Sequence, residues 1–176
     1  MQINAKQKSF FYRLIGLTAS VLLVLSLGVH FITFWNVNLQ ERFPSVLFLH
    51  LGIFVLIVPF LLLIKWEEKQ EKDSNKKMVF PNWLIAIYFI LCLYTVINLA
   101  IFGFADKQNP MIVNGKYVLK NKERVVREVS KEEYDIASAQ SLRGLSGHWI
   151  ISYFFFASIA FLKSSKTKDE ENVSIT

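Results

Sequence analysis

Three histidines are the side chains best suited to chemistry in this 176-residue sequence, and each lies in or beside a different apolar stretch. His30 lies in "SLGVHFITFW", His50 in "VLFLHLGIF" and His148 in "LSGHWIISYFFF". Neutral imidazoles from several helices can coordinate a transition metal or supply the axial ligands of a haem. They can also relay protons or hold a small polar ligand. The sequence therefore raises one chemical hypothesis, a metal or haem site formed by these three residues.

The motifs that usually accompany such chemistry are missing from the sequence. There is no HExxH, no Glu-x-x-His and no cysteine-rich spacing, and no carboxylate falls within the long apolar stretches. No nucleotide-binding loop, dinucleotide fingerprint or Ser-His-Asp combination is present either. The single cysteine, Cys92, lies in the middle of an apolar stretch, where a packing role is usual. These absences favour a non-catalytic protein over an enzyme.

The apolar residues around the histidines are gathered in blocks. Hydrophobic residues make up 53% of the chain, with a mean hydropathy of +0.35, and three blocks cover residues 10–35, 46–64 and 83–104. A hydrocarbon core of roughly 30 Å needs about 20 helical residues. A fourth block, 149–162, reaches this length only if it starts near residue 144. The pattern predicts four transmembrane helices, the first of them retained rather than cleaved as a signal peptide.

Tryptophans and basic residues give the expected orientation. Trp35, Trp66, Trp83 and Trp149 all lie at predicted helix ends, where an amphipathic indole is favoured. Eleven lysines and arginines flank the amino terminus, the connection around 65–77 and the carboxyl tail, against nine on the other side. The short loops distinguish the two sides better: the connection around 65–77 has five basic residues, and the loop between the first two blocks has one, Arg42. We expect a multi-pass protein of a bacterial inner membrane, with both termini in the cytoplasm.

The net charge of +6 does not indicate a nucleic-acid partner. Its basic residues are scattered among acidic ones, as in "KWEEKQEKDSNKK", and they flank the apolar blocks. No RNA- or DNA-binding motif is present, and basic flanks are expected beside anionic lipid. The partner that this charge pattern predicts is the lipid bilayer.

Together these patterns predict an all-α integral membrane protein, a four-transmembrane-helix bundle with a small extracytoplasmic insert between the third and fourth helices. Residues 1–104 are expected to hold the first three helices and their short loops. Residues 105–144 form the insert, 145–163 the fourth helix and 164–176 a loose cytoplasmic tail. Pro59 falls inside the second helix and is expected to kink it.

The insert is predicted to begin as a β-meander. Asn114 and Gly115 give a strong signal for a two-residue hairpin turn, because both turn positions need positive φ. A second, weaker turn falls at "KNKE", and Val125, Val126 and Val129 suit a final strand. The insert therefore reads as three short strands.

A helix is predicted to follow the strands. Ser130 and Glu133, in "SKEE", have the spacing of a capping box, in which each side chain binds the other residue's backbone N–H. Further along, Gly144 and Gly147 are expected to let the chain bend into the fourth transmembrane helix. The sequence thus predicts two separate helices on either side of this bend.

The insert is too small to bury a stable core by itself. It must lean on the helix ends, on another membrane or extracytoplasmic protein, or on its own copy in a homo-oligomer. The residues that we expect to face such a partner are Tyr117, Arg127, Tyr134 and Arg143. A passive cap over the helix ends is the plainer alternative. Arg143 has three further interpretations: binding a lipid phosphate, pairing with Asp106, or simple solvation.

The polar residues of the apolar blocks are expected to lie at one depth. With both termini on the same side, His30 is roughly 6 Å and His50 roughly 7 Å below the outer boundary, at 1.5 Å per helical residue. His148 falls near that boundary, and Asn98 lies roughly 9 Å below it. Polar groups facing lipid are costly, so all should point inward. The polar chamber that this predicts consists of His30, His50, Thr95, Asn98, His148 and Ser152.

Two hypotheses follow for the function. The first is a non-catalytic membrane protein, such as an accessory subunit, that binds a partner through its extracytoplasmic insert. The second is a redox protein that binds haem or a transition metal at His30, His50 and His148. Ordinary hydrogen bonds between helices are the favoured explanation of the buried histidines, and this makes the first hypothesis the preferred one.

Overall fold

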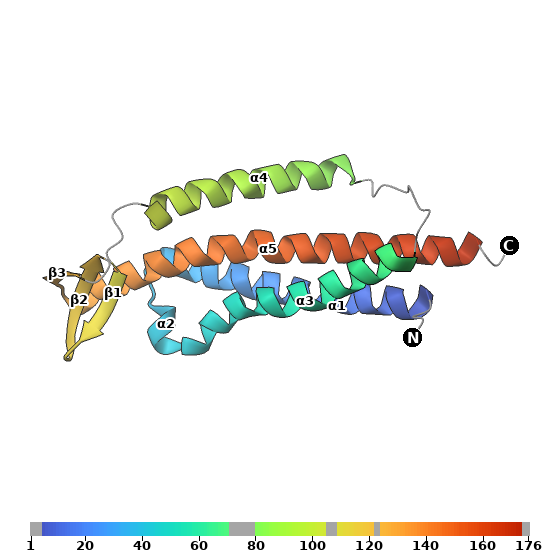
Figure 1. Cartoon of the computed structure of the whole chain (residues 1–176). Helices are drawn as coiled ribbons and strands as arrows, with labels where there is room; N and C mark the ends of the chain where they lie inside the picture. Colours follow the sequence, from blue (N-terminus) through green and yellow to red (C-terminus); the bar gives the residue numbers. More distant parts are fainter. Residues whose placement is uncertain (1–4, 71–79, 105–108, 122–123, 174–176) are drawn as a thin grey trace.

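The computed structural model describes residues 5–70, 80–104, 109–121 and 124–173. It contains four long α-helices: α1 (Ala5–Ile32), α3 (Phe48–Gln70), α4 (Asn82–Leu99) and α5 (Lys131–Val173) (Figure 1). The short elements η1 (Thr33–Trp35), α2 (Leu39–Arg42) and η2 (Pro44–Leu47) join α1 to α3. A π-helical turn, η3 (Ala100–Phe104), extends α4. Both described ends of the chain lie at the same end of the bundle (Figure 1).

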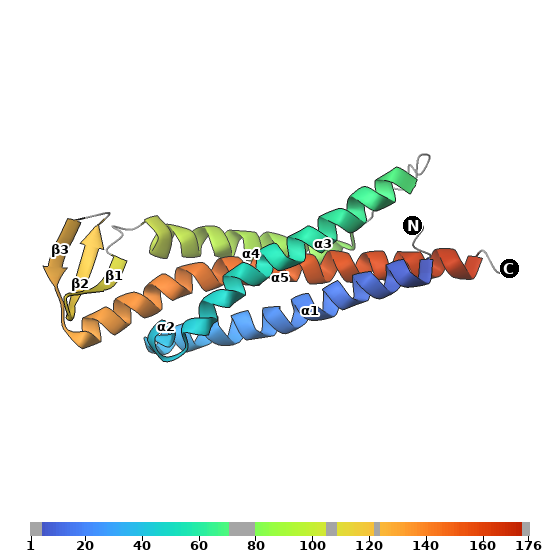
Figure 2. The same cartoon turned by 60° about the horizontal axis from the view of Figure 1, so that its bottom comes forward.

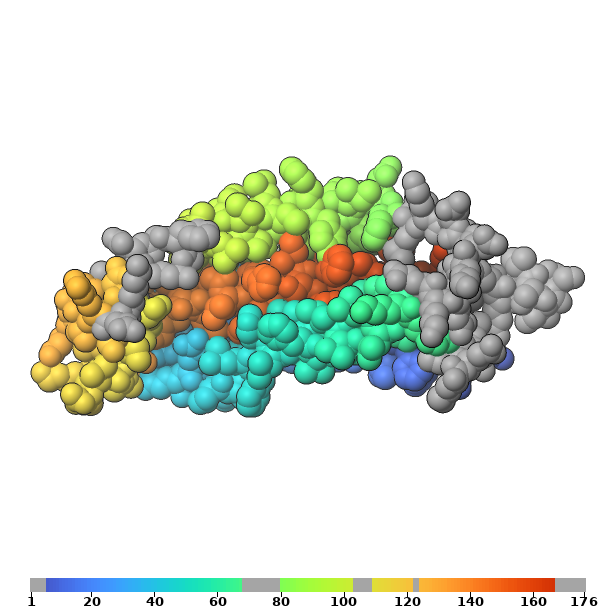
Figure 3. Space-filling model, in the orientation of Figure 1, coloured from blue at the N-terminus to red at the C-terminus, as the bar shows by residue number. Residues whose placement is uncertain are grey.

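Helix α5 is the centre of the bundle. It packs along α1 for much of its length, and α3 and α4 each contact it as well. Figures 1 and 2 show α4 on one side of α5 and α1 on the other, with α3 crossing obliquely. In the space-filling view, α5 remains visible as a stripe between α4 and α3 (Figure 3). Helices α1 and α4 are therefore held mainly by α5, while α3 packs on both α1 and α5.

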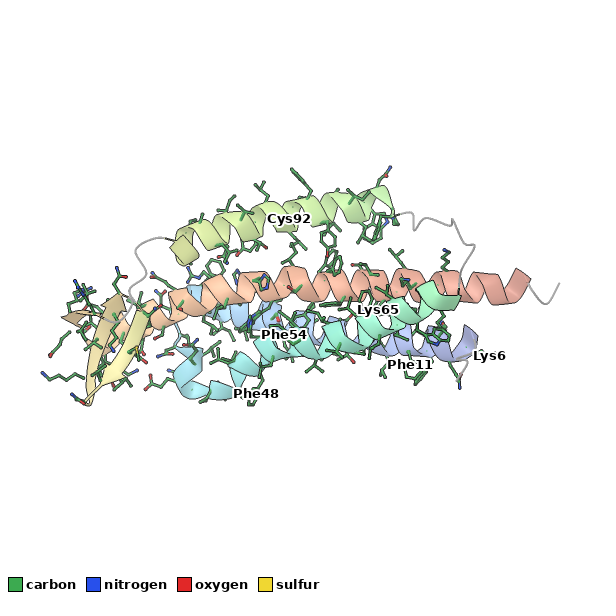
Figure 4. The ribbon with its side chains drawn as sticks, viewed as in Figure 1. Lys6, Phe11, Phe48, Phe54, Lys65 and Cys92 are labelled. Carbon is green, nitrogen blue, oxygen red and sulfur yellow. The ribbon has the colours of Figure 1, made fainter. Side chains whose placement is uncertain are left out.

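All four long helices are long and apolar enough to cross a membrane, as the sequence predicted. The qualifying segments are Lys6–Trp35, Pro44–Glu67, Asn82–Phe102 and Lys131–Lys166. Their outward surfaces are apolar: Phe48 and Phe54 of α3 are more than half exposed, and Cys92 of α4 is exposed too (Figure 4). The buried residues of α4 are instead Leu84, Thr95 and Asn98. Polar groups turned inward and apolar groups turned outward are what helices facing lipid require.

The predicted bend between the insert and the fourth helix is wrong. Helix α5 runs unbroken from Lys131 to Val173 and is about 65 Å long at 1.5 Å per residue. Its glycines serve contact with α4 instead: a Cβ on Gly147 would overlap the Asn98 side-chain amide, and one on Gly144 would lie 3.3 Å from Phe102 Cβ. The helix also continues beyond residue 163, where the sequence suggested a loose tail.

The insert forms a three-stranded antiparallel sheet in the order β1 (Asn109–Val113), β2 (Lys116–Asn121), β3 (Arg124–Glu128). The hairpin prediction is confirmed, because Asn114 and Gly115 connect β1 to β2 with φ of 51° and 76°. Of the predicted "KNKE" turn, residues 122–123 lie outside the described residues. The β2–β3 register breaks between Leu119 and Lys120 and leaves Val126 of β3 without a partner on β2. The sheet thus carries a bulge in its β3 edge.

The start of α5 is capped as predicted. The Ser130 backbone N–H donates to Glu133 Oε2 over 3.2 Å, and the Glu133 backbone N–H donates to Ser130 Oγ over 3.1 Å. This reciprocal pair satisfies two of the donors that a helix start leaves open. It fixes the point at which the chain passes from the sheet into α5.

The core of the bundle lies between α1, α3 and α5. Tyr12, Leu142, Trp149 and Tyr153 are fully buried in it. Trp149 was expected at a water boundary, but its ring belongs to this core. Trp35 and Trp83, by contrast, are 72% and 62% exposed at their helix ends. Pro59 lies inside α3, and the helix continues on both sides of it.

Candidate functional site

Six polar residues connect α1, α4 and α5 near the sheet end of the bundle. We call them the polar cluster: His30, Thr33, Tyr94, Asn98, Arg143 and Ser146. His30, Thr33, Asn98 and Ser146 are buried, at 5%, 0%, 3% and 0% exposure. Helix α5 contributes its side chains and carbonyls from one turn, so the cluster forms where α1 and α4 approach that turn from different sides. It contains His30 and Asn98, two of the residues that the sequence predicted in a polar chamber.

The hydrogen bonds of His30 have one consistent direction. Ser146 Oγ donates to the Arg143 carbonyl over 3.2 Å, so the same oxygen accepts from His30 Nδ1, 2.8 Å away. In a neutral imidazole, His30 Nε2 then carries no proton and accepts from the Tyr94 hydroxyl. This tautomer has its proton on Nδ1, and both ring nitrogens have hydrogen-bond partners. His30 has no nitrogen left to coordinate a metal or a haem iron.

The Ser146–His30 distance also matches that of a nucleophile and its general base. Two observations oppose this role. Ser146 is fully buried, and its hydroxyl also lies 3.2 Å from the Arg143 carbonyl, a group that can only accept a hydrogen bond. The contact therefore serves to join α1 to α5.

Asn98 fixes the position of α4. Its side-chain nitrogen donates to the carbonyls of Arg143 and Gly144 over 3.0 and 3.3 Å. These carbonyls lie beside Gly147, whose missing side chain makes room for the amide. An amide that satisfies two carbonyls in an apolar environment holds the helices in one register.

Arg143 completes the cluster on its outer side. Its Nε donates to Thr33 Oγ1 over 3.4 Å, and one Nη2–H donates to the Thr33 carbonyl. The guanidinium carbon lies 4.3 Å from the ring centre of Phe34 and 5.1 Å from that of Phe102. Every one of these partners is neutral. No carboxylate pairs with Arg143 among the residues that the structure describes, and Asp106, one predicted partner, lies outside them.

The other two histidines lie apart from the polar cluster. His50 Nδ1 accepts from Trp149 Nε1 over 3.0 Å, and because an indole nitrogen only donates, His50 carries its proton on Nε2. His148 is exposed on the outer face of α5, and Ser152 Oγ donates to its carbonyl over 2.9 Å. Across the described residues, no group of three or more His, Cys, Asp or Glu side chains could hold a metal ion. The expected convergence of three histidines is therefore not found.

Thr95 and Ser26 are buried beside the polar cluster, one turn further into the bundle. Thr95 is 8% exposed and Ser26 fully buried, and neither hydroxyl has a hydrogen-bond partner among the described atoms. Thr95 was expected in a polar chamber and is indeed inward-facing. Tyr94 and Ser146 were missed. A signal for Tyr94 exists, since it precedes Asn98 by four residues and so shares its helix face.

A second polar group attaches the sheet to the bundle. Lys131 Nζ pairs with Glu41 and lies 2.6 Å from Asp135 Oδ1, to which Asn38 Nδ2 donates over 2.8 Å. The Tyr117 and Tyr134 rings lie 5.0 Å apart, with Lys131 Nζ 5.4 Å from each centre. The sheet, α2 and α5 are thereby joined at one point.

The residues expected to meet a partner are thus mostly occupied inside the molecule. Tyr117 and Tyr134 contact each other, and Arg127 Nη1 pairs with Glu133 Oε1 at 3.1 Å while both remain exposed. Arg143 belongs to the polar cluster and not to the insert surface. The exposed apolar surface of the sheet lies elsewhere. It consists of Met111, Ile112, Val125 and Val126, at 44%, 54%, 49% and 48% exposure.

Two hollows on the bundle offer no chemistry of their own. One of about 460 Å³ lies between α1 and α3, and one of about 390 Å³ lies between α1, α4 and α5. Hydrocarbon side chains line most of both, and their polar side chains are serine hydroxyls, such as Ser45 in the first and Ser158 in the second. Neither lining contains a residue that could act as an acid or base.

Comparisons of the chain with known protein families, with curated proteins and with solved structures found no match. What the site can do chemically therefore rests on its geometry. The polar cluster joins three helices through buried, internally satisfied hydrogen bonds, and it carries one cation, Arg143, that remains without a charged partner among the described residues.

Proposed function

We propose that this chain is a non-catalytic multi-pass membrane protein that binds another protein through its three-stranded sheet. Four helices are long and apolar enough to span a bilayer, and their exposed surfaces are largely apolar. The basic residues of the short loops favour cytoplasmic termini, which places the sheet on the opposite side. A bacterial inner membrane is the location that we propose.

The observation that carries this proposal is the exposure of β3 on a firmly mounted sheet. All five residues of β3 are exposed, including Val125 and Val126. The sheet is attached to α5 through the Tyr117 ring, which contacts Tyr134 and Lys131, and through the Arg127–Glu133 pair. Apolar groups exposed on a rigid support favour binding over a passive cap.

Side-chain recognition fits this edge better than the addition of a further strand. The bulge at Val126 interrupts the regular backbone that a new strand would need, and charged Arg124, Arg127 and Glu128 surround the valines. The partner that we propose is therefore a protein with an apolar contact surface and acidic and basic residues around it.

The alternative function, a metal or haem redox protein, has no specific observation in its favour. Both ring nitrogens of His30 and Nδ1 of His50 are hydrogen-bonded within the bundle, and His148 lies on an exposed face.

The test is photocrosslinking of the full-length protein in its own membrane. A photoreactive amino acid at Val126 is expected to give one discrete protein adduct, and one at Leu17, a lipid-facing residue that is 58% exposed, is expected to give none. The double variant V125S/V126S should lose co-purification of that partner, while Ile112→Ser on the opposite edge should keep it. An adduct between two copies would identify the partner as this chain. No adduct at Val126, or equal loss in both edge variants, would contradict the proposal.

A further inference from the structure

Arg143 is a half-buried cation with an incomplete set of partners. A guanidinium has five N–H donors, and only two of them find acceptors here, both on Thr33. Two N–H groups on Nη1 and one on Nη2 have no acceptor among the described residues. A partly desolvated charge without a counter-ion is costly, so a negatively charged ligand would be stabilised at this position.

The unused donors have the geometry of an oxyanion site. Thr33 holds the guanidinium from its Nε side, while Phe34 and Phe102 contact it through their rings. This support leaves the outer edge, with its two terminal nitrogens, as the free part of the fork. Paired N–H groups of this kind bind two oxygens of one phosphate.

The position of Arg143 in the bundle indicates which phosphate. The apolar length of α1 ends at Trp35, which is 72% exposed, and Phe34 beside it is 53% exposed. Tryptophan at a helix end marks the headgroup level of a bilayer. On α5, Leu145 just beyond Arg143 is 39% exposed. The guanidinium therefore lies where exposed apolar surface gives way to polar surface, which is the level of lipid phosphates.

We propose that Arg143 binds the phosphate group of a phospholipid in the leaflet on the sheet side. The ligand chemistry is a phosphate oxyanion, and the surrounding exposed aromatic and aliphatic side chains favour one that carries acyl chains over free phosphate. Arg143 holds the headgroup while Thr33 holds Arg143. The inference uses the proposed membrane insertion but not the proposed partner.

The experiment is native mass spectrometry of the purified full-length protein offered two lipids with identical acyl chains. Phosphatidylglycerol is expected to remain bound, and a phosphate-free galactosyl diacylglycerol is not. Arg143→Gln should weaken phosphatidylglycerol binding about tenfold, because it removes a charge-assisted bidentate contact. The matched control is Arg127→Gln, an exposed arginine paired with Glu133, which should leave binding unchanged. Arg143→Lys should show partial binding, because the charge remains without the fork.

The outcomes separate the alternatives. Equal retention of both lipids, or unchanged binding in Arg143→Gln, would overturn the phosphate site while leaving membrane insertion intact. Inorganic phosphate that displaces the lipid from wild type at low concentration would show a free-anion site and overturn the lipid assignment. Failure of a folded wild-type chain to hold either lipid would count against the site and insertion together.

A second measurement needs no variant. If Arg143→Gln fails to fold, a photoreactive phosphatidylglycerol is added to the wild type. It should label residues 33–35 and the peptide around 143. Labelling confined to other parts of the bundle would contradict the assignment.

Discussion

The two ends of the helix bundle handle charge in opposite ways. At the end that holds the termini, Glu67 Oε1 lies 3.0 Å from Lys8 Nζ and its other oxygen pairs with Lys163, so α1, α3 and α5 meet around one carboxylate. At the sheet end, Arg143 meets only neutral groups, on η1 and η3, among the described residues. In the first arrangement the Glu67 carboxylate finds its counter-charges within the described chain. The second leaves a charge to be satisfied from outside, which is why we place a ligand there.

We expect substitutions in the polar cluster to destabilise the protein more than substitutions at the other end of the bundle. The largest loss of stability is expected at Gly147, where α4 approaches α5 closely. Gly147→Ala should force the Asn98 amide away from its two carbonyls and destabilise the protein by about 3 kcal/mol, the upper part of the range for overpacking. The measurement is the free energy of unfolding in mixed micelles titrated with SDS.

Gly28→Ala is the matched control for this substitution. Gly28 lies in α1, and a Cβ added there would meet nothing within 4 Å, so alanine should be neutral or slightly stabilising by helix propensity. Equal effects of the two substitutions would show that the close approach of α4 to α5 is not as described.

The carboxylate at the other end should rank second. Glu67→Gln leaves Lys8 and Lys163 close together without their shared counter-ion, and we expect a loss of about 2 kcal/mol in the same unfolding assay, reduced from the fully buried case by partial exposure. Glu128→Gln breaks the exposed Lys116–Glu128 pair at 2.7 Å and should change stability by less than about 0.5 kcal/mol. A larger effect at Glu128 than at Glu67 would reverse the comparison.

Substitution by alanine should destabilise the protein more at the buried His30 than at the exposed His148. His30→Ala removes the partner of both Tyr94 and Ser146 and should cost about 1.5 kcal/mol. His148→Ala, on an exposed face, should stay within about 0.5 kcal/mol of wild type. Similar costs for the two would mean that His148 also has a structural contact.

A smaller effect than at His30 is expected at the sheet junction. Ser130→Ala removes one half of the capping box and should destabilise the start of α5 by about 1 kcal/mol. Because the rest of α5 is held by α1, hydrogen exchange at residues 131–135 should rise while that of Trp149 and Tyr153 stays unchanged. Faster exchange along all of α5 would show that the sheet and the bundle unfold as one unit.

Local rules predicted much of the fold from the sequence. Four apolar blocks gave four long helices, Asn114-Gly115 gave the hairpin turn, and Ser130 with Glu133 gave the helix cap. The same rules failed at Gly144 and Gly147, since a glycine that breaks a helix and a glycine that admits a neighbouring helix look alike in one sequence.

The polar cluster was harder to predict because its contacts depend on how each helix is rotated about its axis. These helices are apolar on nearly every face, so the sequence gives little sign of the rotation. His30 and Asn98 were placed at a common depth, and both contact the same turn of α5. His148 was placed at a similar depth, but it faces outward, and Ser146 two residues earlier faces His30.

Both ring nitrogens of His30 and Nδ1 of His50 are used within the bundle, and this is the central claim to test. Long-range ¹H–¹⁵N correlation spectra of ¹⁵N-histidine-labelled protein report this directly, because they distinguish the two neutral tautomers. We predict a proton on Nδ1 of His30 and on Nε2 of His50, with the His30 signals unchanged when zinc or haemin is added. The same tautomer at both residues, or a shift of the His30 signals on adding metal or haemin, would contradict this claim.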